Sequence, residues 1–193
     1  MTTAPRRSGG VPPGRAAVAS FGAAVAAIGA ALCVAACAPT FDWREARPDG
    51  SGVAMLFPCR PERRERPVRL ADSAVVVRLD ACGAGGTTFG LAAVDAADPT
   101  RVRPLLEALR AQAVANIAGA ARIEAPAAVP GATPNPLAER LRIVGRGPDG
   151  AAVVEHALFF VKGTTVFQAT TLGAVEPADR DTVDTFFGSI RLP

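Results

Sequence analysis

The sequence contains few of the residues that most often carry catalysis or hold metals. Its 193 residues include one histidine, His156, and four cysteines. A hydrolytic triad needs a nucleophile, a histidine and an orienting acid, and no serine of the chain lies in a Gly-x-Ser-x-Gly motif. The acidic residues are scattered, without a spacing that would pair two carboxylates for catalysis. The sequence therefore predicts no catalytic residues.

One glycine-rich stretch, "GRGPDG" at 145–150, matches the Gly-x-Gly-x-x-Gly pattern of dinucleotide-binding loops. That loop must lead from a strand into a helix whose first turn meets the pyrophosphate. Here the following residues, "AAVVEHALFFV", are typical of a strand, so we interpret the stretch as a turn and predict no cofactor. In that strand His156 shares a face with Val154, Leu158 and Phe160, which favours a partly buried histidine with a hydrogen-bond partner.

The first part of the chain has the features of an export signal. Three arginines and no acid occur in residues 1–15, and residues 16–36 carry no charge. About 20 apolar residues suffice to cross a bilayer as a helix, so an uncleaved anchor in the inner membrane is the alternative.

The stretch "VAAC" at 34–37 resembles the bacterial lipobox, in which an apolar residue and two small residues precede a cysteine. The resemblance implies a signal peptide at 1–36, cleavage before Cys37 and attachment of fatty chains to Cys37, with 37–51 as a lipidated tether. Cys33 would be removed with the leader. Because alanine follows Cys37 rather than aspartate, the resemblance also implies an outer-membrane location facing the periplasm.

Export changes the charge and cysteine content of the remaining chain. The leader takes three of the 21 basic residues, which leaves 18 to balance the 18 acids, so we expect no nucleic-acid partner. Cys59 and Cys82 also remain, and an oxidising compartment favours a disulfide between them. Closing that loop would stabilise the fold by roughly 3 kcal/mol. Two cysteines and one histidine are too few for a closed zinc site, so no metal is expected.

The mature part has the length of one domain, at 52–193. Alternation and turn residues predict strands at 53–57, 74–80, 87–96, 138–145, 151–161 and 164–172, and a turn at "CGAGG", 82–86. Leucines at three- and four-residue spacing predict a helix over 104–119, with Pro104 in its first turn and Gly119 as its stop. A proline-rich loop should follow at 125–136, and a short C-terminal helix should bury Val183, Phe186, Phe187 and Ile190. Helices that do not alternate with strands indicate an α+β fold with a largely antiparallel sheet.

This order of elements resembles the PsbP-like domain, including bacterial lipoproteins of the DcrB type. The shared features are Phe57-Pro58 at the end of the first strand, one long helix, a three-strand meander and a closing helix ending in "FFGSI", over about 53–190. The resemblance implies a PsbP-like sandwich that acts as a non-enzymatic accessory or binding module. The metal-binding histidines of some plant members have no match here, and no functional residue is carried over.

Three functions are consistent with these features. The first is an envelope lipoprotein that serves a protein partner as an accessory module. The second is a carrier of a small ligand or lipid in a cleft between the sheet and the 104–119 helix, and the third is an envelope hydrolase. The run "RPERRERPVR" at 60–69 fits either a basic patch for anionic groups or a solvated loop or edge strand, and we favour the solvated loop or edge strand.

Overall fold

The computed structural model describes residues 40–174 and 180–193, and these form a seven-stranded antiparallel sheet with helices on both faces. The sheet order is β3-β4-β5-β9-β8-β7-β6. The strands are β3 (Glu62–Leu70), β4 (Ser73–Ala84), β5 (Thr87–Asp95), β6 (Ala120–Pro126), β7 (Glu139–Arg146), β8 (Ala152–Lys162) and β9 (Thr165–Ala174). This is the expected α+β fold with a largely antiparallel sheet. The predicted leader, tether start and lipidation site, residues 1–39 including Cys37, lie outside the described residues.

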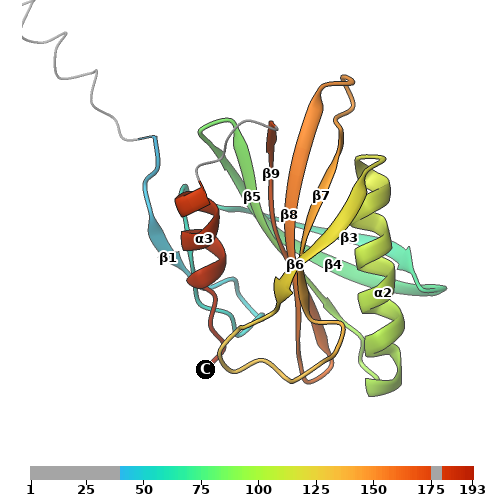
Figure 1. Ribbon diagram of the computed structural model, residues 1–193. Helices are drawn as coiled ribbons and strands as arrows, with labels where there is room; N and C mark the ends of the chain where they lie inside the picture. Colours follow the sequence, from blue (N-terminus) through green and yellow to red (C-terminus); the bar gives the residue numbers. More distant parts are fainter. Residues whose placement is uncertain (1–39, 175–179) are drawn as a thin grey trace, which may run out of the picture. The chain divides into compact units, whose positions relative to one another are not determined.

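Each face of the sheet is covered by a different set of elements (Figure 1). Helix α2 (Pro99–Asn116) packs on one face. Helix α3 (Arg180–Gly188) and the small antiparallel pair β1 (Arg44–Ala46) and β2 (Met55–Phe57) cover the other. The sheet therefore separates two hydrophobic cores, because side chains alternate between its faces.

The core under α3 is rich in phenylalanine. Phe186 of α3 is fully buried, with its ring centroid 5.4 Å from that of Phe57 and 5.3 Å from that of Phe89. The core under α2 is built mainly from leucine, isoleucine and valine, with Leu105 and Leu106 almost completely buried. The predicted alternation in β4 is confirmed, since Val75 and Val77 belong to the α2 side.

The prediction that the long helix begins at Pro104 is wrong, because α2 begins five residues earlier. The side chain of Asp98 accepts a hydrogen bond from the backbone N–H of Thr100. Pro99 occupies the first helical position, where the backbone N–H has no partner within the helix, so the missing N–H of a proline costs nothing. Pro104 lies inside the helix. At the other end the left-handed residue is Ala118, at φ 43°, and the N–H of Gly119 bonds to Val114 O at 2.9 Å.

Three further boundaries differ from the sequence prediction. Strand β6 was not predicted, and it extends into the expected loop at 125–136, so the final meander has four strands rather than three. Strand β1 was also missed. Residues 82–84 of the expected turn continue β4, and the turn itself is made by Gly85 and Gly86, both with positive φ. All residues of β6 are exposed, so the strand has no buried face and no alternation of apolar and polar residues from which it could be predicted.

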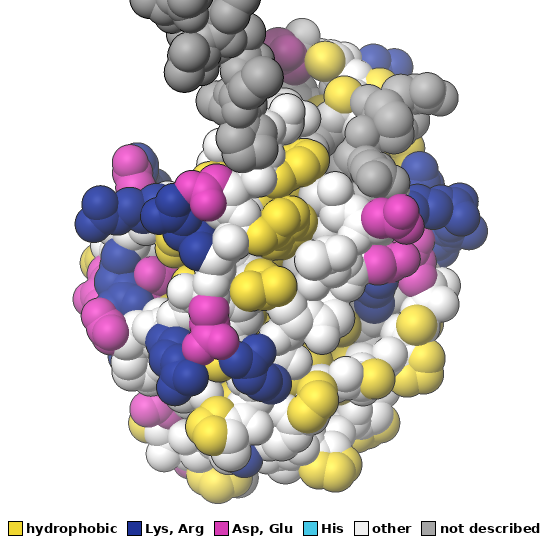
Figure 2. All heavy atoms as spheres, turned by 90° about the vertical axis from the view of Figure 1, so that its left-hand side faces the viewer, with side chains coloured by type: hydrophobic (Ala, Val, Ile, Leu, Met, Phe, Trp, Pro, Cys, Tyr) yellow, Lys and Arg dark blue, Asp and Glu magenta, His cyan; other side chains and the backbone are white. Residues whose placement is uncertain are grey.

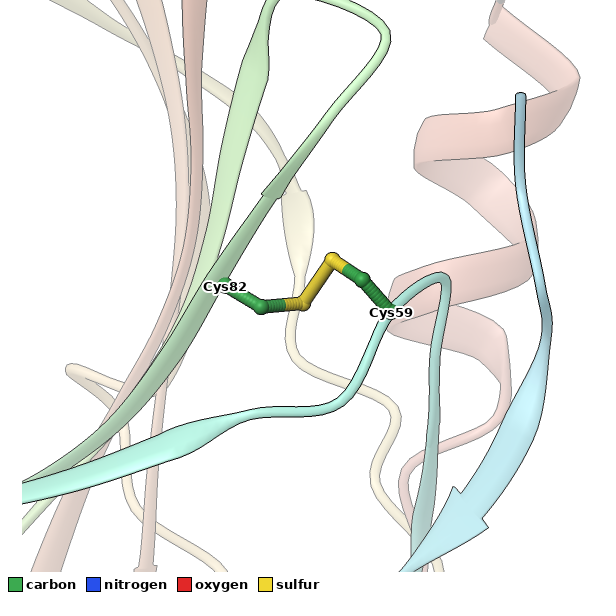
Figure 3. Close-up of a disulfide and its surroundings, with 2 residues drawn as sticks. All are labelled: Cys59 and Cys82. Carbon is green, nitrogen blue, oxygen red and sulfur yellow. A yellow bond between two sulfur atoms is a disulfide. The ribbon is translucent and has the colours of Figure 1, made fainter.

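A disulfide joins Cys59, just after β2, to Cys82 of β4 (Figure 3). The two sulfurs lie 2.05 Å apart and the bridge closes a separation of 23 residues. It ties the segment that follows β2 to β4, the strand next to the sheet edge. A loop of this length corresponds to a stabilisation of roughly 3 kcal/mol on the chain-entropy model.

Candidate functional site

A mostly apolar pocket lies on the α2 face of the sheet, beside the C-terminal end of α2. Its volume is about 760 Å³, within the range of small-molecule sites. Asn116 and Ile117 border it at the helix end. The sheet contributes Leu79, Ala81, Thr88, Gly90, Ala92, Val153, Glu155, Gln168, Thr170, Leu172 and Ala174, and the β7–β8 turn contributes Gly147, Pro148, Asp149 and Ala151, with Ala152 following at the start of β8.

The hollow exists because the sheet carries small side chains where α2 no longer covers it. An 18-residue helix is about 27 Å long, and α2 ends at Asn116. Beyond that point Ala81, Gly90 and Ala92 present little volume from two neighbouring strands, β4 and β5. A methyl group added at Gly90 would meet only ordinary contacts, 3.5 Å from Leu79 Cδ1. The site is therefore open space over the sheet rather than a tightly packed core.

A small polar cluster faces this apolar pocket. Glu155 of β8, only 4% exposed, accepts hydrogen bonds at Oε1 from Gln168 Nε2 at 3.2 Å and from Thr170 Oγ1 at 3.3 Å. Gln168 also donates to Thr170 at 3.1 Å. The other carboxylate oxygen, Oε2, has no hydrogen-bond partner within 40–174 and 180–193. Burial raises the pKa of Glu155 to about 7, although the two hydrogen bonds act in the opposite direction.

This raised pKa should make the protein less stable as the pH rises from 5 to 8. The native carboxyl keeps its proton to about pH 7, whereas in the unfolded chain it is lost near 4.5. The native state thus binds more protons in this window, and the free energy of unfolding falls through it and levels above pH 7. In Glu155→Gln this slope is absent, so the variant should gain about 2 kcal/mol relative to wild type between pH 5 and 8.

Urea unfolding of the full-length protein in neutral detergent, at both pH values, measures this difference. Glu65→Gln is the matched control, because Glu65 is exposed on β3 and its loss should leave the slope unchanged. If the free energy of unfolding of wild type and Glu155→Gln depends on pH in the same way, the carboxyl of Glu155 does not have the buried environment described here.

The "GRGPDG" stretch forms the β7–β8 turn at the rim of this pocket. Gly147 N–H bonds to Ala151 O at 2.8 Å, and Asp149 Oδ1 accepts from the backbone of Ala151 at 3.0 Å. A strand follows the turn, so the geometry that a dinucleotide requires is not present at this turn. The stretch contributes to the candidate site through its position beside the pocket.

His156, the next residue after Glu155, points to the opposite face of the sheet. Its Nδ1 lies 3.0 Å from Glu124 Oε2, and the same oxygen lies 3.2 Å from Arg140 Nε. Arg140 also donates to Asp184 at 2.8 Å. The histidine is therefore beside a carboxylate, as a hydrolase would require, but no serine, threonine or cysteine lines the cavity that contains it. The interpretation of His156 as partly buried and hydrogen-bonded matches this geometry.

Most of the arginine run lies in the edge strand β3, one of the two solvated alternatives, loop or edge strand, that the sequence analysis favoured over a basic patch. Its Arg63 contacts Asp80 at 3.1 Å and Asp49 at 3.0 Å. Arg64 contacts Glu62 at 3.4 Å. Figure 2 shows basic and acidic side chains lying next to one another at both flanks of the face it views. Charges that pair in this way make β3 a solvated edge rather than a uniform basic patch.

Among the described residues there is no group of three or more histidine, cysteine or acidic side chains arranged to hold a metal. Within the same residues, no helix is both long enough and apolar enough to span a bilayer. No protein-family model, curated protein or solved structure matches the chain.

The pocket residues Glu155, Gln168 and Thr170 were not predicted from the sequence. One signal was available, since Glu155 is the only acidic residue in the apolar run 151–161. A charged side chain in such a strand must find a partner or face a cavity. The sequence predicted a cleft between the sheet and the 104–119 helix. The observed pocket lies beyond the end of that helix and contacts it only at Asn116 and Ile117.

Proposed function

We propose that the protein is a lipid-anchored, non-enzymatic binding module of the bacterial cell envelope, and that it holds a small, largely apolar molecule carrying an amine. The observation that supports this most directly is the apolar pocket with one converging polar cluster at Glu155. Few polar groups in a mostly apolar concave site are typical of small-molecule binding. This favours the carrier among the functions considered from the sequence.

The charges of the pocket support an amine. Glu155 and Asp149 are the ionisable residues that line it, and both are acids, although the whole chain has 21 basic residues. A cationic nitrogen near Glu155 would favour the ionised carboxylate and could donate to the unpaired Oε2. An anionic ligand of the same shape would instead meet the carboxyl groups of Asp149 and Glu155 and no basic side chain among the described lining residues.

Calorimetry with two matched probes tests this assignment. The full-length protein in neutral detergent is titrated with 1-naphthylmethylamine and with 1-naphthoic acid, which share a ring system and differ in charge. We expect the amine to bind about tenfold or more tightly than the acid, because a charge-assisted hydrogen bond contributes about 1.5–3 kcal/mol. Glu155→Gln should remove most of this preference.

Ala92→Leu serves as the blocking variant, because Ala92 lines the pocket and the larger side chain would occupy it. Ala111→Leu is the control, since Ala111 is exposed on α2 away from the lining residues. Equal binding of the two probes would argue against the preference for an amine. Binding that is unaffected by Ala92→Leu but lost in Ala111→Leu would argue against the pocket as the ligand site.

The envelope location is part of the same proposal and is supported by the sequence. "VAAC" at 34–37 supports acylation at Cys37, and Ala38 supports an outer-membrane position facing the periplasm. A disulfide between Cys59 and Cys82 is compatible with an exported, oxidised protein. We also propose that the α+β sandwich is PsbP-like, which is supported by the long helix, the antiparallel sheet and the closing helix.

An accessory role on a protein partner is less well supported. The large exposed hydrophobic side chains of the described chain are Val76, Leu79, Ile123 and Val144. They lie on β4, β6 and β7, and β4 is separated from β7 by three other strands. Scattered residues of this kind are normal on a soluble surface and do not form a docking patch.

A further inference from the structure

Two arginines and the histidine form a row across β6, β7 and β8 on the face that carries α3. Arg122 lies directly opposite Arg142, and Arg142 lies directly opposite His156. Side chains opposite each other on antiparallel strands have Cβ atoms about 4.5–5.5 Å apart, and like charges in such pairs destabilise the sheet. The fold therefore carries an unfavourable arrangement at this position.

Two acids lie near this row, and their contacts are divided among several cations. Glu124 is shared by His156 and Arg140, and Asp184 is bound by Arg140. Arg122 comes only within 3.8 Å of Glu124 and remains largely exposed. Arg142, which is half-buried, has no ion-pair or hydrogen-bond partner in the part of the chain that the structure describes. A half-buried guanidinium without a partner is a site at which an added anion would be stabilising.

These side chains line a cavity of about 470 Å³. Among the described residues its ionisable lining comprises Arg122, Glu124, Arg140, Arg142, His156, Arg180 and Asp184, that is, four arginines, two carboxylates and the histidine. We call this the basic cleft. Arg180 adds a cation from the start of α3, so the positive charges come from β6, β7 and the helix together.

We propose that the basic cleft binds a phosphate group, held between Arg122 and Arg142 and beside His156. Guanidinium groups present planar pairs of N–H donors that match phosphate oxygens, and several arginines can share one tetrahedral anion. A carboxylate has fewer oxygens to distribute among donors from three elements. The phosphate could belong to a soluble phosphate ester or to a phospholipid headgroup, and these sources share the same recognition chemistry.

The single histidine gives this proposal a direct spectroscopic test. Because His156 is the only histidine, its ring signal in the full-length protein in neutral detergent needs no further assignment. Adding inorganic phosphate, with chloride at equal ionic strength as reference, should shift this signal in a saturable way. In Arg142→Gln the affinity should fall about tenfold or more, as expected for loss of charge-assisted hydrogen bonds.

Arg66→Gln is the matched control, because it removes one exposed arginine from β3 and should leave phosphate binding unchanged. In phosphate-free buffer Arg142→Gln should have a Tm equal to or above that of wild type, since the like-charge contact with Arg122 is removed. A lower Tm in that buffer would show that Arg142 serves the fold and would overturn the proposal.

The source of the phosphate follows from a second measurement. The Tm of wild type and Arg142→Gln is compared in phosphatidylglycerol vesicles and in phosphate-free galactolipid vesicles. Stabilisation of wild type alone by phosphatidylglycerol, without a response to inorganic phosphate, assigns the site to lipid headgroups. A response to inorganic phosphate assigns it to soluble phosphate. If neither addition acts through Arg142, the basic cleft is not a phosphate site.

Discussion

Replacing Cys37 by alanine is expected to abolish incorporation of radiolabelled palmitate and to leave the leader attached to the chain. The thiol of Cys37 is the only group to which the lipobox resemblance would attach fatty chains, and alanine offers no nucleophile in its place. Each buried methylene contributes about 0.8 kcal/mol to membrane binding, so the variant loses the lipid anchor and depends on the retained apolar leader, which would hold it in the inner membrane. Labelling of growing cells, followed by separation of inner and outer membranes, measures both effects.

Cys33→Ala is the control for this experiment, because Cys33 lies four residues earlier and would be discarded with the leader. It should be labelled and processed like wild type. Wild-type protein that takes up no palmitate would show that the protein is not a lipoprotein. Cys37→Ala protein that takes up as much as wild type would show that Cys37 is not the acylated residue. An intact leader in wild-type protein would instead indicate the uncleaved inner-membrane anchor.

The second large effect is expected at Phe186, whose ring joins α3 to the sheet. The side chain is completely buried and packs edge-on against Phe57 and Phe89. Phe186→Ala removes this ring and leaves a cavity between helix and sheet, which typically costs about 3–5 kcal/mol. Because native proteins are stable by only about 5–15 kcal/mol, a substantial part of the total stability should be lost.

Urea unfolding followed by circular dichroism measures the change in the free energy of unfolding. Val144→Ala is a suitable comparison, because Val144 is 38% exposed and substitutions at such surface positions usually change stability by no more than about 0.5 kcal/mol. Similar values for the two variants would mean that α3 does not contribute to the core as the described packing requires.

The features that the sequence predicted well are those with strong periodicity or clear turns. Val75, Val77 and Leu79 alternate with Val76, Arg78 and Asp80, so their shared face could be predicted before the structure was known. The connection between β8 and β9 is tight, consisting of Gly163 and Thr164, and Gly163 adopts a φ of 58°. Edge strands were harder to predict. Strand β6 is exposed along its whole length, and its pairing with β7 is determined by tertiary contacts rather than by its own pattern.

The candidate site could not be predicted because its members meet only through strand pairing. Glu155 lies opposite Leu172, and this register places Thr170 on the adjacent diagonal and Gln168 one step further along the same face. The hollow above them depends on Gly90 and Ala92, which come from a different strand, and on where α2 ends. Asp98 determines the start of that helix, and either Pro99 or Pro104 alone would have suited a first turn.

Glu155 and His156 are consecutive residues, so the apolar pocket and the basic cleft are separated by the thickness of one strand. A slip of β8 by a single residue would turn the carboxylate toward the arginines and the imidazole into the pocket, because side-chain direction in a strand repeats every two residues. The register of β8 therefore determines which functional group faces the apolar pocket and which faces the basic cleft.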